Sequence, residues 1–349
     1  MLISLSGADI DVALPLALGA AGGPGRLSPT ARDFLHVLLA ALPGAPTLPD
    51  LADQRTDPTA GRTLHPDVRR RIVQTAIALT MLSEQPSTAD HARITATAAA
   101  LGTREPAVDV IAAIAANAVP LTLVHTIEFD AYRTPVPRDL ALLPAYSRYL
   151  AMGLPPAAIH GTAPNEQLAA LFAPLADLPT GTVGRTFADF YGHHTWRMPG
   201  TPGGVALPLT LHDWLHVYIG ATTEPLGEVE VGAFAAGTTR HQYGFHNLLI
   251  VLLMFEYGMV TAMSGGPGLA PAGALAPRGL ARDGARGVTA NPDGGRMVAD
   301  AILRGHAANT DLYLGVDHLA QAPRDLAELR SAYAIPPRGA YAGALAPTR

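Results

Sequence analysis

The chain has 349 residues, of which 48% are hydrophobic and 15% charged, and its net charge is −5. This composition excludes a disordered chain, and it gives no basic surface for nucleic acid. The sequence contains no cysteine, which excludes disulfides, thiolate metal sites and cysteine nucleophiles. All 24 basic residues are arginine, so Schiff-base chemistry and the lysine of phosphate-binding loops are excluded as well.

The N-terminal residues 1–23 are apolar but carry Asp9 and Asp11 and lack a basic start, so we expect no signal peptide. The most apolar run, 248–255, is followed by Glu256 and is shorter than the roughly 20 apolar residues that span a bilayer. It predicts a buried helix; the lining of a prenyl-chain tunnel and peripheral membrane contact stay open. We expect a cytoplasmic protein, with any membrane contact at the inner face.

The first third of the chain predicts short antiparallel helices joined by polar loops. Ser28 and Pro29 are typical of a helix start, and Phe34 and Leu38 then share one face. After a loop over 43–61, the spacing of apolar residues predicts helices over 65–82, 87–101 and 105–118. We assign residues 1–130 to a small helical bundle.

Within this bundle, the stretch ALTMLSEQPSTADHARITATAAALG has a helix–loop–helix pattern. It resembles the tellurite-resistance protein B-like helical domain. Where that family places acidic metal ligands in the loop, this chain has Glu84 and Asp90. The alternative is a bundle that serves packing or dimerisation.

Two prolines within 134–138 mark the start of a second domain, residues 131–340. Helical spacing predicts helices over 140–152, 166–176, 186–191, 209–219, 227–237, 240–263, 296–308 and 326–333. Residues 264–293 are rich in Gly, Pro and Ala and predict a long loop. Because no alternating strand pattern occurs, we expect an all-α fold.

Two histidines of the 209–219 helix are candidate metal ligands. His212 and His216 are four residues apart, so both imidazoles project from one face, with Asp213 at its flank. A helix-breaking turn over 220–225 would let the next helix return and bring Glu228 across from them. Two nitrogens and one or two carboxylates suit Zn²⁺ or Fe²⁺. The alternative is a pair of core histidines that bond neighbouring carbonyl groups.

The pattern His212-Asp213-x-x-His216, eleven residues and Glu228 resembles the signature of the coenzyme Q biosynthesis protein 4 family. The preceding segment LPTGTVGRTFADFY and the closing segment GHAANTDLYLGVDHLAQAPRDLAELRSAYAIPP are similar to segments of that family. The resemblance covers residues from about 131 to 337. Departures are the lack of a lysine after Glu228, where the chain has VEVG, and Asp317-His318 in place of an Asp-Trp pair.

The resemblance implies an all-helical fold and a divalent metal held by His212, Asp213, His216 and Glu228. Asp213 could instead orient His216 or a water molecule. Zn²⁺ is the expected metal, with Fe²⁺ and Mg²⁺ as alternatives. The implied activity is decarboxylation, coupled or not to oxidation, of a prenylated or hydrophobic hydroxybenzoate-like acid in ubiquinone biosynthesis or in specialised metabolism.

Other roles stay open at this point. The chain could be a non-catalytic scaffold that presents an isoprenoid or other lipid to partner enzymes, or a helical adaptor whose first domain forms a homo-oligomer. In the catalytic alternative, partner enzymes of the pathway would supply any electron acceptor, because the sequence has no flavin or nicotinamide fingerprint.

Four further residues are candidates for contact with the substrate or with the metal ligands. Arg185 could clamp a carboxylate in bidentate fashion, or it could pair with Asp189 four residues on. Arg240, His241 and His246 follow the metal motif, and solvated or structural roles are the alternative for each of them.

Overall fold

The computed structural model describes residues 7–42, 44, 57–83, 85–116, 144–239, 243–257 and 287–344. These residues are mostly helical, which confirms the expected all-α fold, and their one β-type pairing is an isolated bridge between Thr182 and Asp325. The α-helices in chain order are α1 (Gly7–Ala20), α2 (Pro29–Ala40), α4 (Pro66–Leu82), α5 (Thr88–Ala100), α6 (Val108–Ala115), α8 (Pro144–Ala151), α9 (Pro156–Ile159), α10 (Glu166–Phe172), α11 (Val183–His193), α12 (Leu207–Ile219), α13 (Pro225–Thr238), α14 (Tyr243–Phe255), α16 (Gly294–Ala307), α17 (His318–Gln321) and α18 (Leu326–Ala332).

Helix starts follow the capping residues of the sequence. The Ser28 side chain accepts a hydrogen bond from a backbone N–H of the first turn of α2 at 3.1 Å, and Ser87 and Asp90 form a reciprocal capping box at the start of α5. Asp90 also forms an ion pair with Arg93. Its carboxylate therefore serves this helix start, and Glu84 lies outside the described residues.

Helix α1 is an element that the sequence reasoning did not predict. It is apolar on nearly all sides, and Leu14, Ala17 and Leu18 are buried. Asp11 and Gly19 are its exposed residues among those whose burial is described, so its sequence has no broad polar face and no clear helical period.

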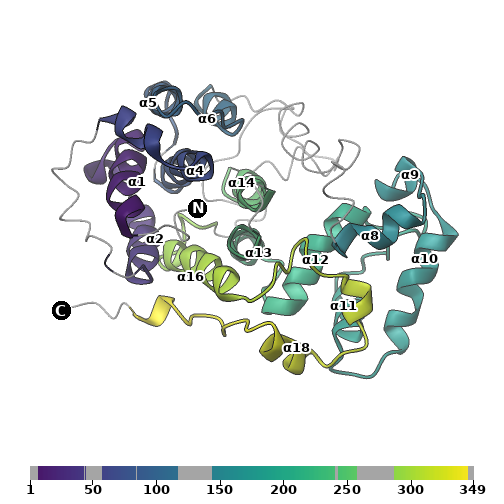
Figure 1. The fold of residues 1–349 in the computed structure, drawn as a ribbon. Helices are drawn as coiled ribbons and strands as arrows, with labels where there is room; N and C mark the ends of the chain where they lie inside the picture. Colours follow the sequence, from purple (N-terminus) through teal and green to yellow (C-terminus); the bar gives the residue numbers. More distant parts are fainter. Residues whose placement is uncertain are drawn as a thin grey trace.

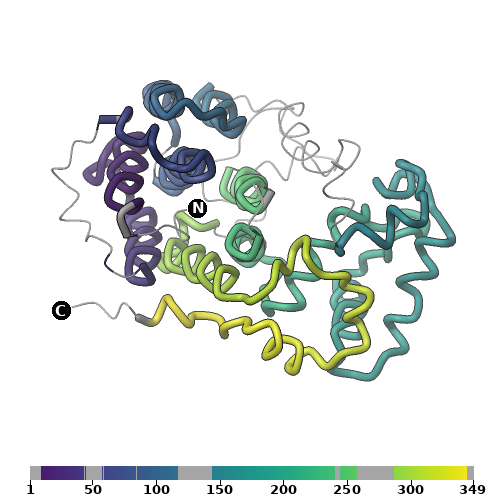
Figure 2. Tube along the Cα trace, in the orientation of Figure 1, coloured from purple at the N-terminus to yellow at the C-terminus, as the bar shows by residue number. Residues whose placement is uncertain are grey.

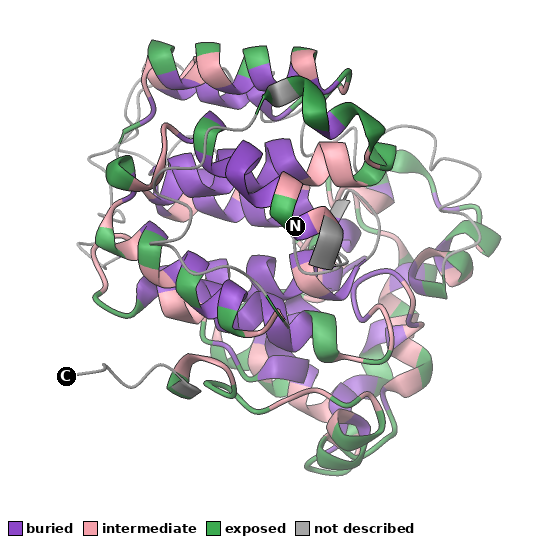
Figure 3. Ribbon diagram, turned by 60° about the vertical axis from the view of Figure 1, so that its left-hand side comes forward, coloured by how far each residue is buried: buried purple, intermediate pink, exposed green. Residues whose placement is uncertain are grey.

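The packing centre is the crossing of α13 and α16, which α14 and α2 flank. Figure 1 shows α13, α14 and α16 between the N-terminal helices and the group that contains α8–α12. Small residues allow the close crossing: a Cβ added at Gly237 would lie 2.0 Å from the Ile302 carbonyl oxygen, and one at Gly305 would lie 2.2 Å from that of Phe234. Figure 3 shows that buried residues are concentrated in the central helices and that exposed residues lie on the outer faces.

The N-terminal helices and the later helices share one apolar core. Its buried residues extend from Ile10 to Leu329 in a single cluster. The Tyr257 hydroxyl, after α14, donates a hydrogen bond to the Met81 carbonyl of α4 at 2.9 Å. The boundary near residue 130 stays a prediction, because 117–143 lie outside the described residues.

The C-terminal segment after α16 runs along α12 and α11 and then returns toward the N-terminal helices (Figure 2). Its last described part is tied to α16, where the Asp300 carboxylate accepts hydrogen bonds from the backbone N–H groups of Gly339, Tyr341 and Ala342. Among the described residues, no helix combines the length and the apolar character needed to cross a membrane.

Candidate metal centre

Helices α12 and α13 follow one another in the chain, joined by a short turn, and carry the candidate ligands. Helix α12 ends at Gly220, whose φ of +71° is left-handed and whose N–H bonds the His216 carbonyl. Gly227, in the first turn of α13, lies so close to the preceding turn that an added Cβ would be 2.2 Å from the Thr222 carbonyl oxygen. A short turn therefore brings Glu228 back toward the histidines.

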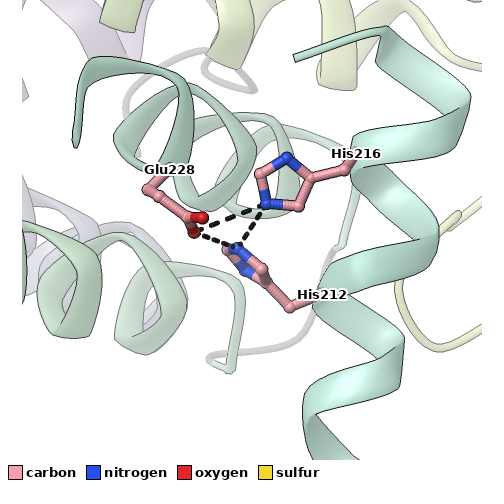
Figure 4. Close-up of side chains that lie close together, drawn as sticks. All are labelled: His212, His216 and Glu228. Atoms are coloured by element: carbon pink, nitrogen blue, oxygen red, sulfur yellow. Dashed lines mark hydrogen bonds and ion pairs between the residues drawn. The ribbon is translucent and has the colours of Figure 1, made fainter. Parts of the chain in front are cut away.

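Three of the four predicted ligands converge (Figure 4). His212 Nε2 lies 2.9 Å from Glu228 Oε2, and His216 Nε2 lies 3.4 Å from the same oxygen. The two Nε2 atoms are 3.2 Å apart. The three side chains come from two helices and form a group whose donor atoms lie within 4.8 Å of one another.

This donor set fits a divalent ion such as Zn²⁺. Ligands bound at about 2.1 Å in tetrahedral geometry lie about 3.4 Å apart, which is close to the separations of these three atoms. His216 Nδ1 lies 3.2 Å from the Ala221 carbonyl oxygen. Because a carbonyl only accepts hydrogen bonds, Nδ1 is the donor to Ala221, and Nε2 is the nitrogen that would bind a cation after losing its own proton.

Burial and charge favour a cation at this point. The exposed fractions of the side chains are 16% for His212, 13% for Glu228 and 1% for His216. Burial acts to raise the pKa of Glu228, but the hydrogen bonds from the two imidazoles outweigh it and lower the pKa to about 2. The carboxylate is therefore ionised, and its negative charge faces the imidazole nitrogens.

Asp213, the fourth predicted ligand, does not join the group. Its carboxylate is buried and accepts a hydrogen bond from the Tyr191 hydroxyl at 2.5 Å. Burial raises the pKa of Asp213 to about 6. Asp213 therefore fixes α12 against α11, on the flank of the ligand face.

Aromatic side chains from the end of α11 lie beside the ligands. The Phe190 ring stacks on the His216 ring with centroids 5.3 Å apart, and the His194 ring meets Phe190 edge-on at 4.9 Å. Trp196 stacks on His194 at 4.8 Å and is 37% exposed. The sequence reasoning gave no site role to Phe190 or Tyr191, although both lie in the segment quoted for the family resemblance.

The face of α12 opposite the candidate ligands packs against His318, the residue that stands where the family pattern has a tryptophan. Trp214 and Tyr218 are each two residues from a candidate ligand, so they point about 200° away from it. His318 is buried, stacks on Trp214 with centroids 5.7 Å apart and hydrogen-bonds the Tyr218 hydroxyl at 3.0 Å. Burial lowers its pKa to about 3. The neighbouring Asp317 pairs with Arg148 at 2.6 Å.

The other predicted site residues lie elsewhere. Arg185 pairs with Asp189 at 2.8 Å, which is the ion-pair alternative of the sequence analysis. His246 lies 3.7 Å from Glu105, beside the N-terminal helices. Arg240 and His241 lie outside the described residues.

A search of protein-family models and a search of curated proteins find no match to this chain. The function is therefore inferred from the side chains described above and from the sequence resemblance.

Proposed function

We propose that this protein is a metal-dependent decarboxylase that acts on a hydrophobic or prenylated hydroxybenzoate-like acid. The observation that carries the proposal is the convergence of His212, His216 and Glu228, whose donor atoms lie within 4.8 Å of one another. Three protein ligands of this kind are typical of catalytic zinc sites, which keep a further position for water or substrate. Imidazole ligands favour Zn²⁺ or Fe²⁺ over Mg²⁺.

The side chains have separate tasks in this reaction. His212, His216 and Glu228 hold the ion, and the Ala221 carbonyl keeps the His216 ring oriented through Nδ1. When bound, a divalent ion supplies Lewis-acid stabilisation of the negative charge that develops on the substrate. The bond between the ring and the carboxyl carbon breaks, CO₂ leaves, and the ring carbon takes a proton. An oxidative variant of the reaction needs an oxidant from a partner enzyme.

The surroundings of the ligands support a planar, hydrophobic substrate. Phe190 stacks on His216, and Trp196 meets Phe190 edge-on. Leu209 is 50% exposed and precedes His212 by three residues, so it lies on the same face of α12 as the ligands. The resemblance to the coenzyme Q biosynthesis protein 4 family supports the same substrate class, with other enzymes of a biosynthetic pathway as partners.

Metal content tests this proposal directly. We expect plasma mass spectrometry of untagged wild-type protein to find about one Zn or Fe per chain, and His212→Ala/His216→Ala to lose it. The matched control His36→Ala/His193→Ala removes two exposed histidines and should keep the metal. Release of CO₂ from hydroxybenzoates with apolar ring substituents is then assayed on the metal-loaded protein. Absence of metal from wild-type protein purified without chelators would refute the proposal.

A further inference from the structure

His216 lies in the last turn of α12. Two arginines from the C-terminal part of the chain bind the backbone carbonyl groups of this turn. Arg330 of α18 donates from Nη2 to the Val217 oxygen at 2.9 Å and from Nε to the Tyr218 oxygen at 2.7 Å. Arg304 of α16 donates from Nη2 to the Ile219 oxygen at 3.4 Å. The last four carbonyl groups of a helix have no partner within the helix. In α12, guanidinium groups bind three of these four carbonyl groups.

Arg304 also reaches the helix that carries Glu228. Its Nη1 donates to Glu230 Oε1 at 3.0 Å, and its Nε donates to the Pro336 carbonyl at 2.9 Å. Arg338 binds the other oxygen of Glu230 at 2.6 Å. One guanidinium group thus joins the end of α12, the second turn of α13 and the C-terminal segment.

The position of Glu230 on α13 links Arg304 to the helix segment that carries Glu228. Glu228 and Glu230 are two residues apart, so their side chains leave α13 on opposite faces. Glu228 faces the histidines, and Glu230 faces Arg304. A displacement of Arg304 would therefore affect both the end of α12 that carries His216 and the part of α13 that carries Glu228. Arg304 itself contacts neither ligand.

Arg304 and Glu230 cannot be replaced singly without a cost in stability. The side chains of Arg304 and Glu230 are 2% and 1% exposed, so removal of one partner leaves a buried charge. Arg304 uses Nε and both terminal nitrogens on three acceptors in different directions, which the single ammonium of a lysine does not match.

We propose that Arg304, Arg330 and Glu230 are positioning residues for the metal centre, which hold the His216 turn and the Glu228 turn in register. This inference rests on the proposed function, because it requires that the three converging side chains bind metal. It assigns to the C-terminal segment, more than 70 residues from the ligands, a part in setting metal affinity.

Co²⁺ binding to the full-length protein tests the inference, with calorimetry for affinity and visible absorption for coordination. Arg330→Met removes two contacts of α12 from a half-buried side chain. Arg304→Met/Glu230→Met removes the buried pair together, a change that often leaves a fold intact. The control Arg296→Met lies on the same helix as Arg304 and removes an ion pair with Asp33. Circular dichroism checks the fold of each protein.

We expect about tenfold weaker Co²⁺ binding and shifted visible bands in Arg330→Met and in the paired variant, on the scale of outer-shell effects on metal sites, with Arg296→Met unchanged. A merely structural role would lower thermal stability and leave affinity and spectrum as in the wild type, which would overturn the inference alone. If the paired variant does not fold, Arg330→Met decides the question. A wild-type protein that binds no Co²⁺ would overturn the proposed function, and this inference with it.

Discussion

Glu228→Gln is the sharpest test of the ligand set, because it keeps the shape of the side chain and removes its charge. Glu228 Oε2 contacts both imidazoles, at 2.9 Å and 3.4 Å. A glutamine can still place an oxygen or an amide group there, but it gives no anionic ligand. We therefore expect the metal affinity to fall while the helical fold is kept.

The expected loss follows from the number of ligands. Structural zinc sites with four ligands bind with about 10–16 kcal/mol, or about 3 kcal/mol per ligand. A centre with three protein ligands that loses one should bind about a hundredfold more weakly, since about 1.4 kcal/mol is a factor of ten. Asp213→Asn makes the same chemical change beside His212, but its carboxylate faces Tyr191, so we expect it to cost less than about tenfold.

Competition with a chromophoric zinc chelator at neutral pH measures both affinities, and circular dichroism verifies the fold. A larger loss in Asp213→Asn than in Glu228→Gln would show that Asp213 is the carboxylate ligand. Equal, small losses in both variants would show that the two histidines bind metal without either carboxylate.

Three further predictions concern the packing that supports α12. The contribution of His318 to the free energy of unfolding should fall by about 1.4 kcal/mol per pH unit from about pH 6.5 toward pH 3, because His318 is buried as the neutral ring and the unfolded chain takes up the proton; the stability difference between the wild type and His318→Phe, measured by urea unfolding, should therefore be smaller at about pH 5 than at about pH 7. Gly227→Ala should lower thermal stability and Zn²⁺ affinity together, because its Cβ would meet the Thr222 carbonyl at 2.2 Å; unchanged affinity would contradict this reason. Phe187→Ala should destabilise the fold by about 3–5 kcal/mol in urea unfolding, because its buried ring stacks on Trp214 at 3.8 Å.

The elements with capping residues and an amphipathic period could be predicted from the sequence. Ser28 and Ser87 mark the starts of α2 and α5, and the helices that follow have one apolar face. Helix α1 could not be found in this way, because most of its residues are buried and Pro15 lies inside it. Short helices such as α9 and α17 depend on their tertiary surroundings, which no local pattern encodes.

The same distinction applies to the site. His212, His216 and Glu228 lie on two consecutive helices, so a turn and a helical period suffice to bring them together. Tyr191 meets Asp213 across 22 residues of sequence, and that contact depends on how α11 packs against α12. Without it, the adjacent carboxylate of Asp213 looks equivalent to that of Glu228.

The role of Glu230 shows why the local sequence pattern alone does not reveal which acidic residues belong to the candidate site. The sequence places Glu230 two residues after Glu228, where it looks like a second acidic ligand or a solvated side chain. The fold instead turns it to Arg304, 74 residues on, and that arginine reaches back to Ile219 beside the His216 turn. Because a helix presents opposite faces at this spacing, Glu228 can face the two histidines while Glu230 binds Arg304. The separation of the two roles is a property of the three-helix arrangement, and it is what the paired Arg304→Met/Glu230→Met substitution removes while it leaves every ligand in the chain.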